Sequence, residues 1–128
     1  MKTKSILMGV ALMASLMFGC KKDEPKEDIS WAYGKWEVTD VKTKESDKYS
    51  NWLSQEWYAR FDSNGSYSSR SPQFYSGTYT VKGNDITCKV GSETVVYNIL
   101  SRSGNLAEAR MYYGSSPNVF VWFKLKRQ

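Results

Sequence analysis

Few residues of this chain have side chains suited to catalysis. Its 128 residues include no histidine, which removes the usual general base and the commonest transition-metal ligand. Of the two cysteines, Cys88 shares one face of an alternating run with Ile86 and Val90, a pattern that favours burial. Zinc sites built on cysteine clusters need more thiolates than this chain has. We therefore expect no metal site and no cofactor.

The carboxylates are the remaining candidates for catalysis. No two of them form a recognisable pair with the spacing of an acid and a base. Glu108 and Arg110 share one face of a segment, and an outward orientation is favoured, in which they form a weak surface pair. An inward orientation would instead give an internal ion pair or an anchor for a polar ligand group. We predict no catalytic residue and a protein that is not an enzyme.

Aromatic side chains are the most prominent groups able to bind a ligand. The candidate pocket for an apolar or amphipathic small molecule consists of Trp57, Tyr75, Tyr79 and Tyr97. The alternative is that the rings fill the interior and leave no cavity.

A second aromatic group is expected on the outside. Phe120 and Trp122 alternate with Lys124, and large exposed aromatic residues indicate a surface for a partner protein. The alternative is that the segment 43–55 covers this stripe through Trp52 and Leu53.

The N-terminus has the features of a secretory signal. Lys2 and Lys4 precede an apolar run over residues 6–18, followed by a Gly-Cys pair. The run is shorter than the roughly twenty apolar residues that span a bilayer. The sequence M-F-G-C resembles the lipobox of bacterial lipoproteins, which implies a signal peptide over 1–19 and lipidation of Cys20. A plain signal peptide and a core helix are the alternatives.

Residues 20–30 are predicted to form the lipidated cysteine and a flexible tether. The stretch is dense in charge and nearly free of apolar residues, so it cannot bury itself. Its start resembles the export signals of Bacteroidetes-type surface lipoproteins, and Lys21 after Cys20 is compatible with transfer to the outer membrane. The expected location is the cell outer membrane, lipid-anchored and either periplasmic or surface-exposed.

The remaining chain, 31–128, is predicted to be one all-β domain. Period-two alternation and turns rich in Gly, Asn and Ser predict eight strands, at 33–42, 56–62, 65–71, 74–82, 85–90, 93–101, 105–113 and 118–126. Asn64-Gly65 is a strong hairpin signal, and connections this short make neighbouring strands antiparallel. We predict an eight-stranded up-and-down barrel, because closure removes exposed strand edges. A two-sheet β-sandwich is the alternative.

Strand parity also predicts the interior. The inward residues are expected to be Trp36, Val38, Trp57, Ala59, Phe61, Tyr75, Tyr79, Val81, Ile86, Cys88, Val90, Val95, Tyr97, Ile99, Val119, Val121, Phe123 and Leu125. Tyr67 is expected to face outward, and the alternation of 105–113 is too weak to assign an inner face.

Several short motifs occur in the order found in one family. They are G-x-W at Gly34–Trp36, D-x-N-G in the first hairpin, G-x-Y-x-V at Gly77–Val81 and a Lys-rich last strand. Together they resemble the lipocalin-like domains of Bacteroidetes-type lipoproteins. The resemblance implies that Trp36 closes one end of the barrel beneath a basic residue of the last strand. Parity assigns that part to Arg127, as a cation–π contact.

The resemblance also implies a function. We expect an envelope lipoprotein that binds a small apolar or amphipathic molecule. The alternative is a non-catalytic envelope interaction module, either a subunit of a surface complex or an inhibitor of a secreted enzyme. The expected partners are the membrane, through the lipid on Cys20, a small apolar ligand and an envelope protein. The formal net charge of the chain is only +5, and its sequence contains no run of five or six basic residues. Nucleic acid is therefore not an expected partner.

Overall fold

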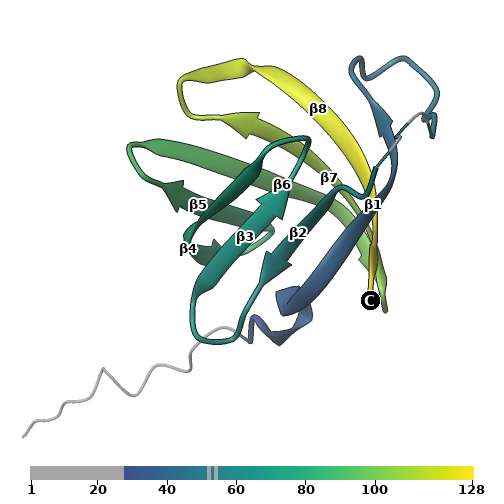
Figure 1. Ribbon diagram of the computed structural model, residues 1–128. Helices are drawn as coiled ribbons and strands as arrows, with labels where there is room; N and C mark the ends of the chain where they lie inside the picture. Colours follow the sequence, from purple (N-terminus) through teal and green to yellow (C-terminus); the bar gives the residue numbers. More distant parts are fainter. Residues whose placement is uncertain (1–27, 52, 54) are drawn as a thin grey trace, which may run out of the picture.

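Eight antiparallel strands form a closed barrel (Figure 1). The computed structural model describes residues 28–51, 53 and 55–128. A 3-10 helix, η3 (Ser30–Ala32), precedes the strands β1 (Gly34–Lys42), β2 (Tyr58–Phe61), β3 (Ser66–Arg70), β4 (Phe74–Lys82), β5 (Asp85–Val90), β6 (Glu93–Ser103), β7 (Leu106–Tyr113) and β8 (Ser116–Arg127). Each strand pairs with the next, and β8 pairs with β1. The predicted up-and-down barrel is confirmed, and the sandwich alternative is wrong.

Part of the sequence-based prediction falls outside this description. The signal peptide, Cys20 and the tether as far as residue 27 lie outside the described residues, as does Trp52. Among the residues that are described, no helix is both long and apolar enough to cross a membrane.

The two ends of the barrel differ. We call the end that holds η3, the β2–β3, β4–β5 and β6–β7 turns and the C-terminus the closed end; it lies at the bottom of Figure 1. The opposite end, with the long β1–β2 connection and the β3–β4, β5–β6 and β7–β8 turns, is the open end.

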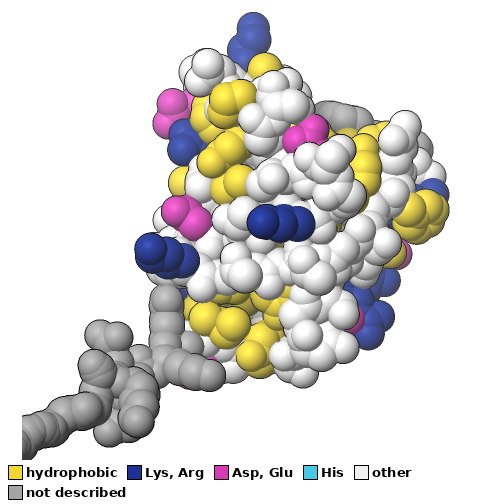
Figure 2. All heavy atoms as spheres, turned by 90° about the vertical axis from the view of Figure 1, so that its left-hand side faces the viewer, with side chains coloured by type: hydrophobic (Ala, Val, Ile, Leu, Met, Phe, Trp, Pro, Cys, Tyr) yellow, Lys and Arg dark blue, Asp and Glu magenta, His cyan; other side chains and the backbone are white. Residues whose placement is uncertain are grey.

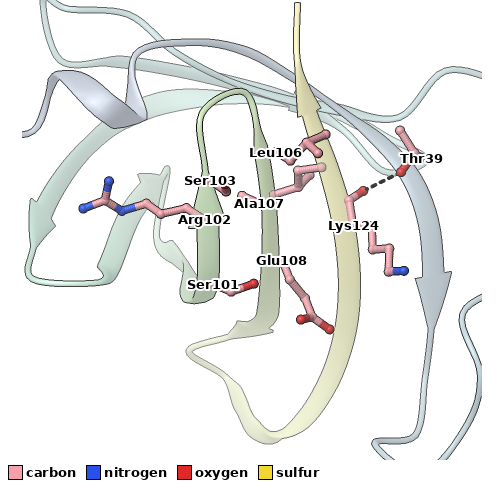
Figure 3. Close-up of a pocket in the computed structure, with 9 residues that line it drawn as sticks. Thr39, Ser101, Arg102, Ser103, Leu106, Ala107, Glu108 and Lys124 are labelled. Carbon is pink, nitrogen blue, oxygen red and sulfur yellow. Dashed lines mark hydrogen bonds between the residues drawn. The ribbon is translucent and has the colours of Figure 1, made fainter.

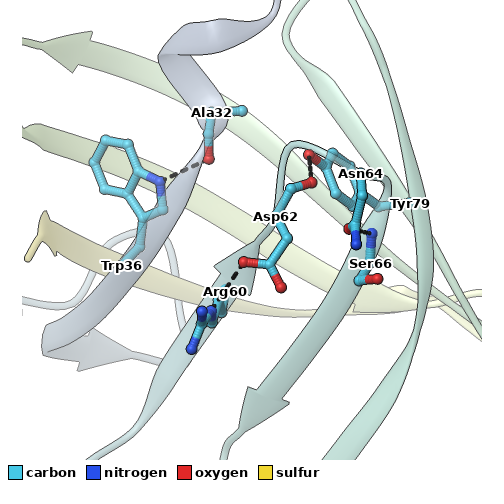
Figure 4. A network of polar contacts seen from close by, with 7 residues as sticks. All are labelled: Ala32, Trp36, Arg60, Asp62, Asn64, Ser66 and Tyr79. Carbon is cyan, nitrogen blue, oxygen red and sulfur yellow. Dashed lines mark hydrogen bonds and ion pairs between the residues drawn. The ribbon is translucent and has the colours of Figure 1, made fainter.

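The β2–β3 turn shows how local sequence sets the register (Figure 4). Gly65 has a φ of +92°, which glycine adopts without a steric penalty. The amide of Ser66 donates to Asn64 Oδ1 at 3.0 Å, and the Tyr79 hydroxyl donates to the carbonyl of Asp62 at 2.6 Å. The turn therefore places Phe61 opposite the residue at position 67.

That register corrects the prediction for Tyr67. Directly opposed residues of an antiparallel pair share one face of the sheet, so Tyr67 faces inward with Phe61 and is only 2% exposed. The same parity brings Ser69 inside, where it is 1% exposed. The outward prediction for Tyr67 was wrong, because the register across the turn pairs Tyr67 with the inward residue Phe61.

The last two strands supply the other corrections. Val119 is 67% exposed, not inward, because a register shift after Met111 displaces this part of β8 from its neighbour. Ala109 and Met111 are buried, so they define the inner face of β7. Glu108 and Arg110 alternate with them and lie on the outer face, which was the favoured orientation.

The outer face of β3, β4 and β5 is mostly uncharged and polar. Its strands present serine and threonine side chains, among them Ser68, Ser76, Thr78, Thr80 and Thr87. Figure 2 shows this side of the molecule, with few charged side chains and apolar groups confined to separate patches. Such a wall needs no cover from another layer.

Arg127 holds the closed end together. Its guanidinium carbon lies 4.9 Å from the centroid of the Trp36 ring, which is the contact that the family resemblance implied and that strand parity assigned to Arg127. The Nη1 atom donates to the carbonyls of Trp31 at 2.8 Å and Tyr33 at 3.1 Å, and Nε donates to Asn105 Oδ1 at 3.0 Å. One side chain thus connects β8 with β1, η3 and the β6–β7 turn.

Gly34 completes this arrangement. A Cβ atom at Gly34 would lie 3.1 Å from Arg127 Cδ, and its φ is +115°. The indole nitrogen of Trp36 meanwhile donates to the carbonyl of Ala32 at 3.0 Å (Figure 4). The glycine of the G-x-W motif therefore allows the arginine stem to lie against the backbone.

We predict that Trp36→Ala and Arg127→Ala lower stability non-additively. The two substitutions remove the same contact, so a double-mutant cycle measured by urea unfolding is expected to give a coupling energy of about 0.5–2 kcal/mol. Strictly additive losses would show that the stacked pair contributes nothing.

Gly77 offers a second test of the packing. A Cβ atom there would lie 1.8 Å from the backbone oxygen of Lys89, so Gly77→Ala must push β4 away from β5. We expect a loss of at least about 2 kcal/mol in the free energy of unfolding. The exposed neighbouring substitution Ser76→Ala is expected to change stability by less than about 0.5 kcal/mol. Equal effects of the two would contradict this packing.

Candidate functional site

The half of the barrel near the closed end is filled by side chains. The void there measures about 10 Å³, room for about one water molecule at most. Its walls are Trp31, Ala32, Trp36, Phe61, Ile86, Ile99, Ala107 and Leu125. A ligand of several carbon atoms has no space in this half without repacking.

A cluster of aromatic rings occupies the middle of the barrel. The Phe61 centroid lies 5.6 Å from that of Tyr67, 5.1 Å from that of Tyr79 and 5.8 Å from that of Tyr97. The hydroxyls of Tyr67 and Tyr97 lie 2.6 Å apart in a hydrogen bond. Burial raises the pKa of both tyrosines, so these groups are neutral at physiological pH.

Cys88 lies inside this part of the barrel. Its side chain is 0% exposed and free, and burial raises the pKa of its thiol. Because the thiolate is the reactive form, Cys88 is a packing residue, as the sequence indicates.

The four residues of the predicted pocket do not lie together. Tyr97 belongs to the central ring cluster, and Tyr79 points its hydroxyl to Asp62 at the closed end. Only Trp57 and Tyr75 lie near the open end, where both are half-buried against the core. The structure thus divides the predicted set between the filled core and the open end.

The open end carries a ring of partly buried side chains. Trp57 packs edge-on to Phe123 with centroids 6.3 Å apart, and Tyr75 packs against Tyr113 at 6.4 Å. Burial raises the pKa of Tyr113 to about 12. The full set, which we call the mouth ring, is Leu53, Trp57, Tyr75, Val90, Tyr113 and Val121.

The mouth ring is suited to binding and not to proton transfer. Its members contact the core on one side and solvent on the other, so a small apolar molecule gains contact area there without displacing the core. The sequence-based prediction did not include Tyr113, because the weak alternation of β7 left its inner face unassigned. It expected Leu53 to cover the outer stripe of Phe120 and Trp122. No simple signal marks Leu53, which comes from an irregular segment.

The outer stripe of Phe120 and Trp122 is covered by its own neighbours. Trp122 is only 9% exposed, and the Lys42 ammonium lies 5.9 Å from its ring centroid. The Arg110 guanidinium lies 4.2 Å from the Phe120 ring centroid. Tyr49, from the segment 43–55, donates its hydroxyl to Glu108 on the same wall at 2.5 Å. Tyr49 of the segment 43–55 therefore lies on this wall, whereas Leu53 packs against the core.

A groove of about 340 Å³ crosses the outer wall near the closed end (Figure 3). Its lining includes Thr39, Ser101, Glu108 and Lys124. The Thr39 hydroxyl donates to the carbonyl of Lys124 at 3.3 Å, and Glu108 accepts from Tyr49. Because the Thr39 hydroxyl and the Glu108 carboxylate already have partners, the groove is a weaker candidate than the mouth ring.

Comparisons with known proteins agree with this fold. A family model described as a lipocalin-like domain matches residues 33–106. A solved structure with a similar fold is that of an uncharacterized protein from Bacteroides eggerthii DSM 20697. It has 11% sequence identity and a TM-score of 0.51, over 76% of this chain and 99% of that chain. The search of curated proteins finds no match.

The family match extends from just before Gly34 through the first six strands, and the barrel closes as the G-x-W motif predicts. Because the match covers more than half of the sequence, the chain belongs to the lipocalin-like domain family.

Proposed function

We propose that this chain is an outer-membrane lipoprotein, anchored through lipid on Cys20, whose barrel binds a small apolar or amphipathic molecule at its open end. The observation that carries the binding role is the mouth ring: six apolar or aromatic side chains that pack on the core yet keep a solvent-facing side. The role is binding and not catalysis.

The filled lower half limits where the ligand lies. Since the void near Trp36 is only about 10 Å³, the molecule rests on the central rings and does not pass below them. Arg127 seals the opposite end. Entry and exit both occur through the mouth ring.

The anchor is supported by the sequence alone. The basic start, the apolar run over 6–18 and the Gly-Cys pair favour processing before Cys20. The charged stretch that follows is suited to a tether between the lipid and the barrel. The protein would then present its open end within the cell envelope, near a source of amphipathic molecules.

A second candidate function is docking of an envelope protein at the open end. Phe74 is 68% exposed and Val119 67% exposed, and both lie at strand ends on this side of the barrel. Exposed apolar residues at one end of a barrel also fit a protein partner. In this case the barrel would be a subunit of a surface complex or an inhibitor of a secreted enzyme.

Ligand binding can be measured by calorimetric titration of the purified Cys20→Ser protein, which lacks the lipid acceptor. Octanol serves as the amphipathic probe and toluene as the apolar probe. We expect saturable binding of both, weakened about fivefold or more by Tyr113→Ala, because the ring supplies contact area worth about 1 kcal/mol.

Tyr112→Ala is the matched control, since Tyr112 is the adjacent tyrosine on the outer face. We expect its affinities to stay within about twofold of the unsubstituted values. Absence of saturable binding of either probe would refute the small-molecule role and leave protein docking as the stronger candidate.

The anchor is tested by metabolic labelling with a fatty acid. We expect label in the natural protein and in Cys88→Ala, and none in Cys20→Ser, because only Cys20 follows the lipobox-like sequence. Undiminished label in Cys20→Ser would remove the proposed location while leaving the barrel unaffected.

A further inference from the structure

The exposed large apolar side chains of the described residues occur as two pairs, one toward each end of the barrel. Phe74 and Val119 belong to the open end, whereas Leu100 and Leu106 belong to the β6–β7 hairpin at the closed end. Leu100 is 49% exposed and Leu106 is 58% exposed. Two exposed leucines on one hairpin are a candidate contact surface.

The β6–β7 hairpin projects beyond its neighbour β5. The pairing of β5 with β6 ends at Asn98, whereas the pairing of β6 with β7 continues to Ser103. Residues 100–106 therefore extend past β5, and we call them the hairpin tip. Figure 3 shows Ser103 and Leu106 where this hairpin turns.

The hairpin tip has no acidic side chain. Its sequence is L-S-R-S-G-N-L, in which Arg102 is the single charged residue. Lys126 of β8 lies directly opposite Leu106, and Glu37 on the far side of Lys126 accepts a hydrogen bond from Gln128 at 3.0 Å. Leucines beside arginine and lysine are suited to a lipid surface, because the apolar groups enter the bilayer interface while the long cationic side chains reach its phosphates.

The chain that leads to the proposed lipid joins the barrel beside the hairpin tip. The Arg102 guanidinium carbon lies 4.2 Å from the ring centroid of Trp31. The described part of the chain begins three residues before Trp31, at Asp28. The segment between Cys20 and the barrel therefore starts from the same end of the barrel as the exposed leucines.

That segment is short compared with the barrel. Eight residue steps separate Cys20 from Asp28, and a fully extended chain covers at most about 3.6 Å per step, or about 29 Å in all. The strand β8 has 12 residues, and at about 3.3 Å per residue and a tilt of about 40° such a strand rises about 30 Å along a barrel axis. Turning the open end toward the bilayer would therefore require the whole extended length of the segment, whereas the closed end reaches the bilayer easily.

We propose that the hairpin tip rests on the bilayer that holds the lipid of Cys20, with Leu100 and Leu106 in its interface and the open end directed away from it. This inference rests on the lipid anchor of the proposed function and adds an orientation to it. The mouth ring then exchanges its ligand with the aqueous side and not directly with the bilayer.

The open-end pair is the competing contact surface. The Arg70 guanidinium carbon lies 4.8 Å from the ring centroid of Phe74, and Val119 lies near the start of β8. Both apolar side chains are at the opposite end from Asp28, where the segment from Cys20 joins. In the proposed orientation they stay available to a protein partner.

The orientation is measured by nuclear magnetic resonance on the lipidated protein in nanodiscs of phosphatidylethanolamine and phosphatidylglycerol that contain a gadolinium-chelate lipid. Gadolinium broadens the amide signals of residues that lie near the bilayer surface. Because contact of this kind is shallow, we expect a loss of about half of the signal or more for Ser103 and Asn105 at the hairpin tip. Gln73 and Ser92, in turns at the open end, should keep their signals.

The double variant Leu100→Ser, Leu106→Ser removes the apolar contact. Both side chains are exposed, so the melting temperature should change by less than about 5 °C. The signal loss at Ser103 is expected to fall about twofold or more, because the tip no longer enters the interface. Phe74→Ser, Val119→Ser is the matched control, since it removes the exposed pair of the other end, and it should leave the pattern unchanged.

The outcomes separate this inference from the proposed function. Signal loss centred on Gln73 and Ser92, or equal at both ends, would overturn the orientation while the anchor stands. An unchanged pattern in Leu100→Ser, Leu106→Ser would also overturn it. Mass spectrometry of the purified protein shows whether Cys20 carries lipid, and an unmodified Cys20 would contradict the anchor and this inference together. Failure of octanol to bind would contradict the small-molecule role and leave the orientation unaffected.

Discussion

The stacking of Arg127 on Trp36 is the contact on which the arrangement of this barrel depends. An up-and-down barrel must join its last strand to its first, and here the joint is reinforced from inside by one guanidinium. The Arg127 guanidinium donates hydrogen bonds to two backbone carbonyls before β1 and to Asn105. These oxygen atoms and the face of the Trp36 indole ring stabilise its positive charge. Side chains fill the closed end, so a molecule that enters the barrel from solvent must do so at the open end.

Side-chain volume then decides what the rest of the barrel can do. An eight-stranded barrel has an interior just wide enough to be filled by side chains or to hold one small ligand. Here side-chain filling differs with depth along the barrel. The rings around Phe61 fill the middle, whereas the mouth ring is only half covered. The proposed binding site at this end is therefore shallow.

The sequence predicts the fold well because short-range signals specify it. Alternation located all eight strands within a few residues, and the family resemblance together with strand parity placed Arg127 over Trp36. The failures arose where the pairing between two strands decides which way a residue faces. The turn before Ser66 moves Tyr67 inward, and the shift after Met111 moves Val119 outward. The alternation of apolar and polar residues within one strand predicts neither orientation, since each depends on how two strands align.

The candidate site was harder to predict for the same physical reason. Residue type identified rings able to bind a ligand, but depth along the barrel separates Tyr79 from Trp57, and depth is a property of the assembled sheet. Ser69 carries no sequence signal, because a serine in a strand is ordinarily exposed. Its burial follows from the register that also brings Tyr67 inside the barrel.

The most direct test of this account is to map amide chemical shifts of the purified protein during titration with octanol. The account predicts shifts that saturate at the open end, at Ser69, Tyr75 and Tyr113, with little change around Trp36 and Arg127. Shifts centred on the outer groove at Thr39 and Lys124, or at the closed end, would contradict it.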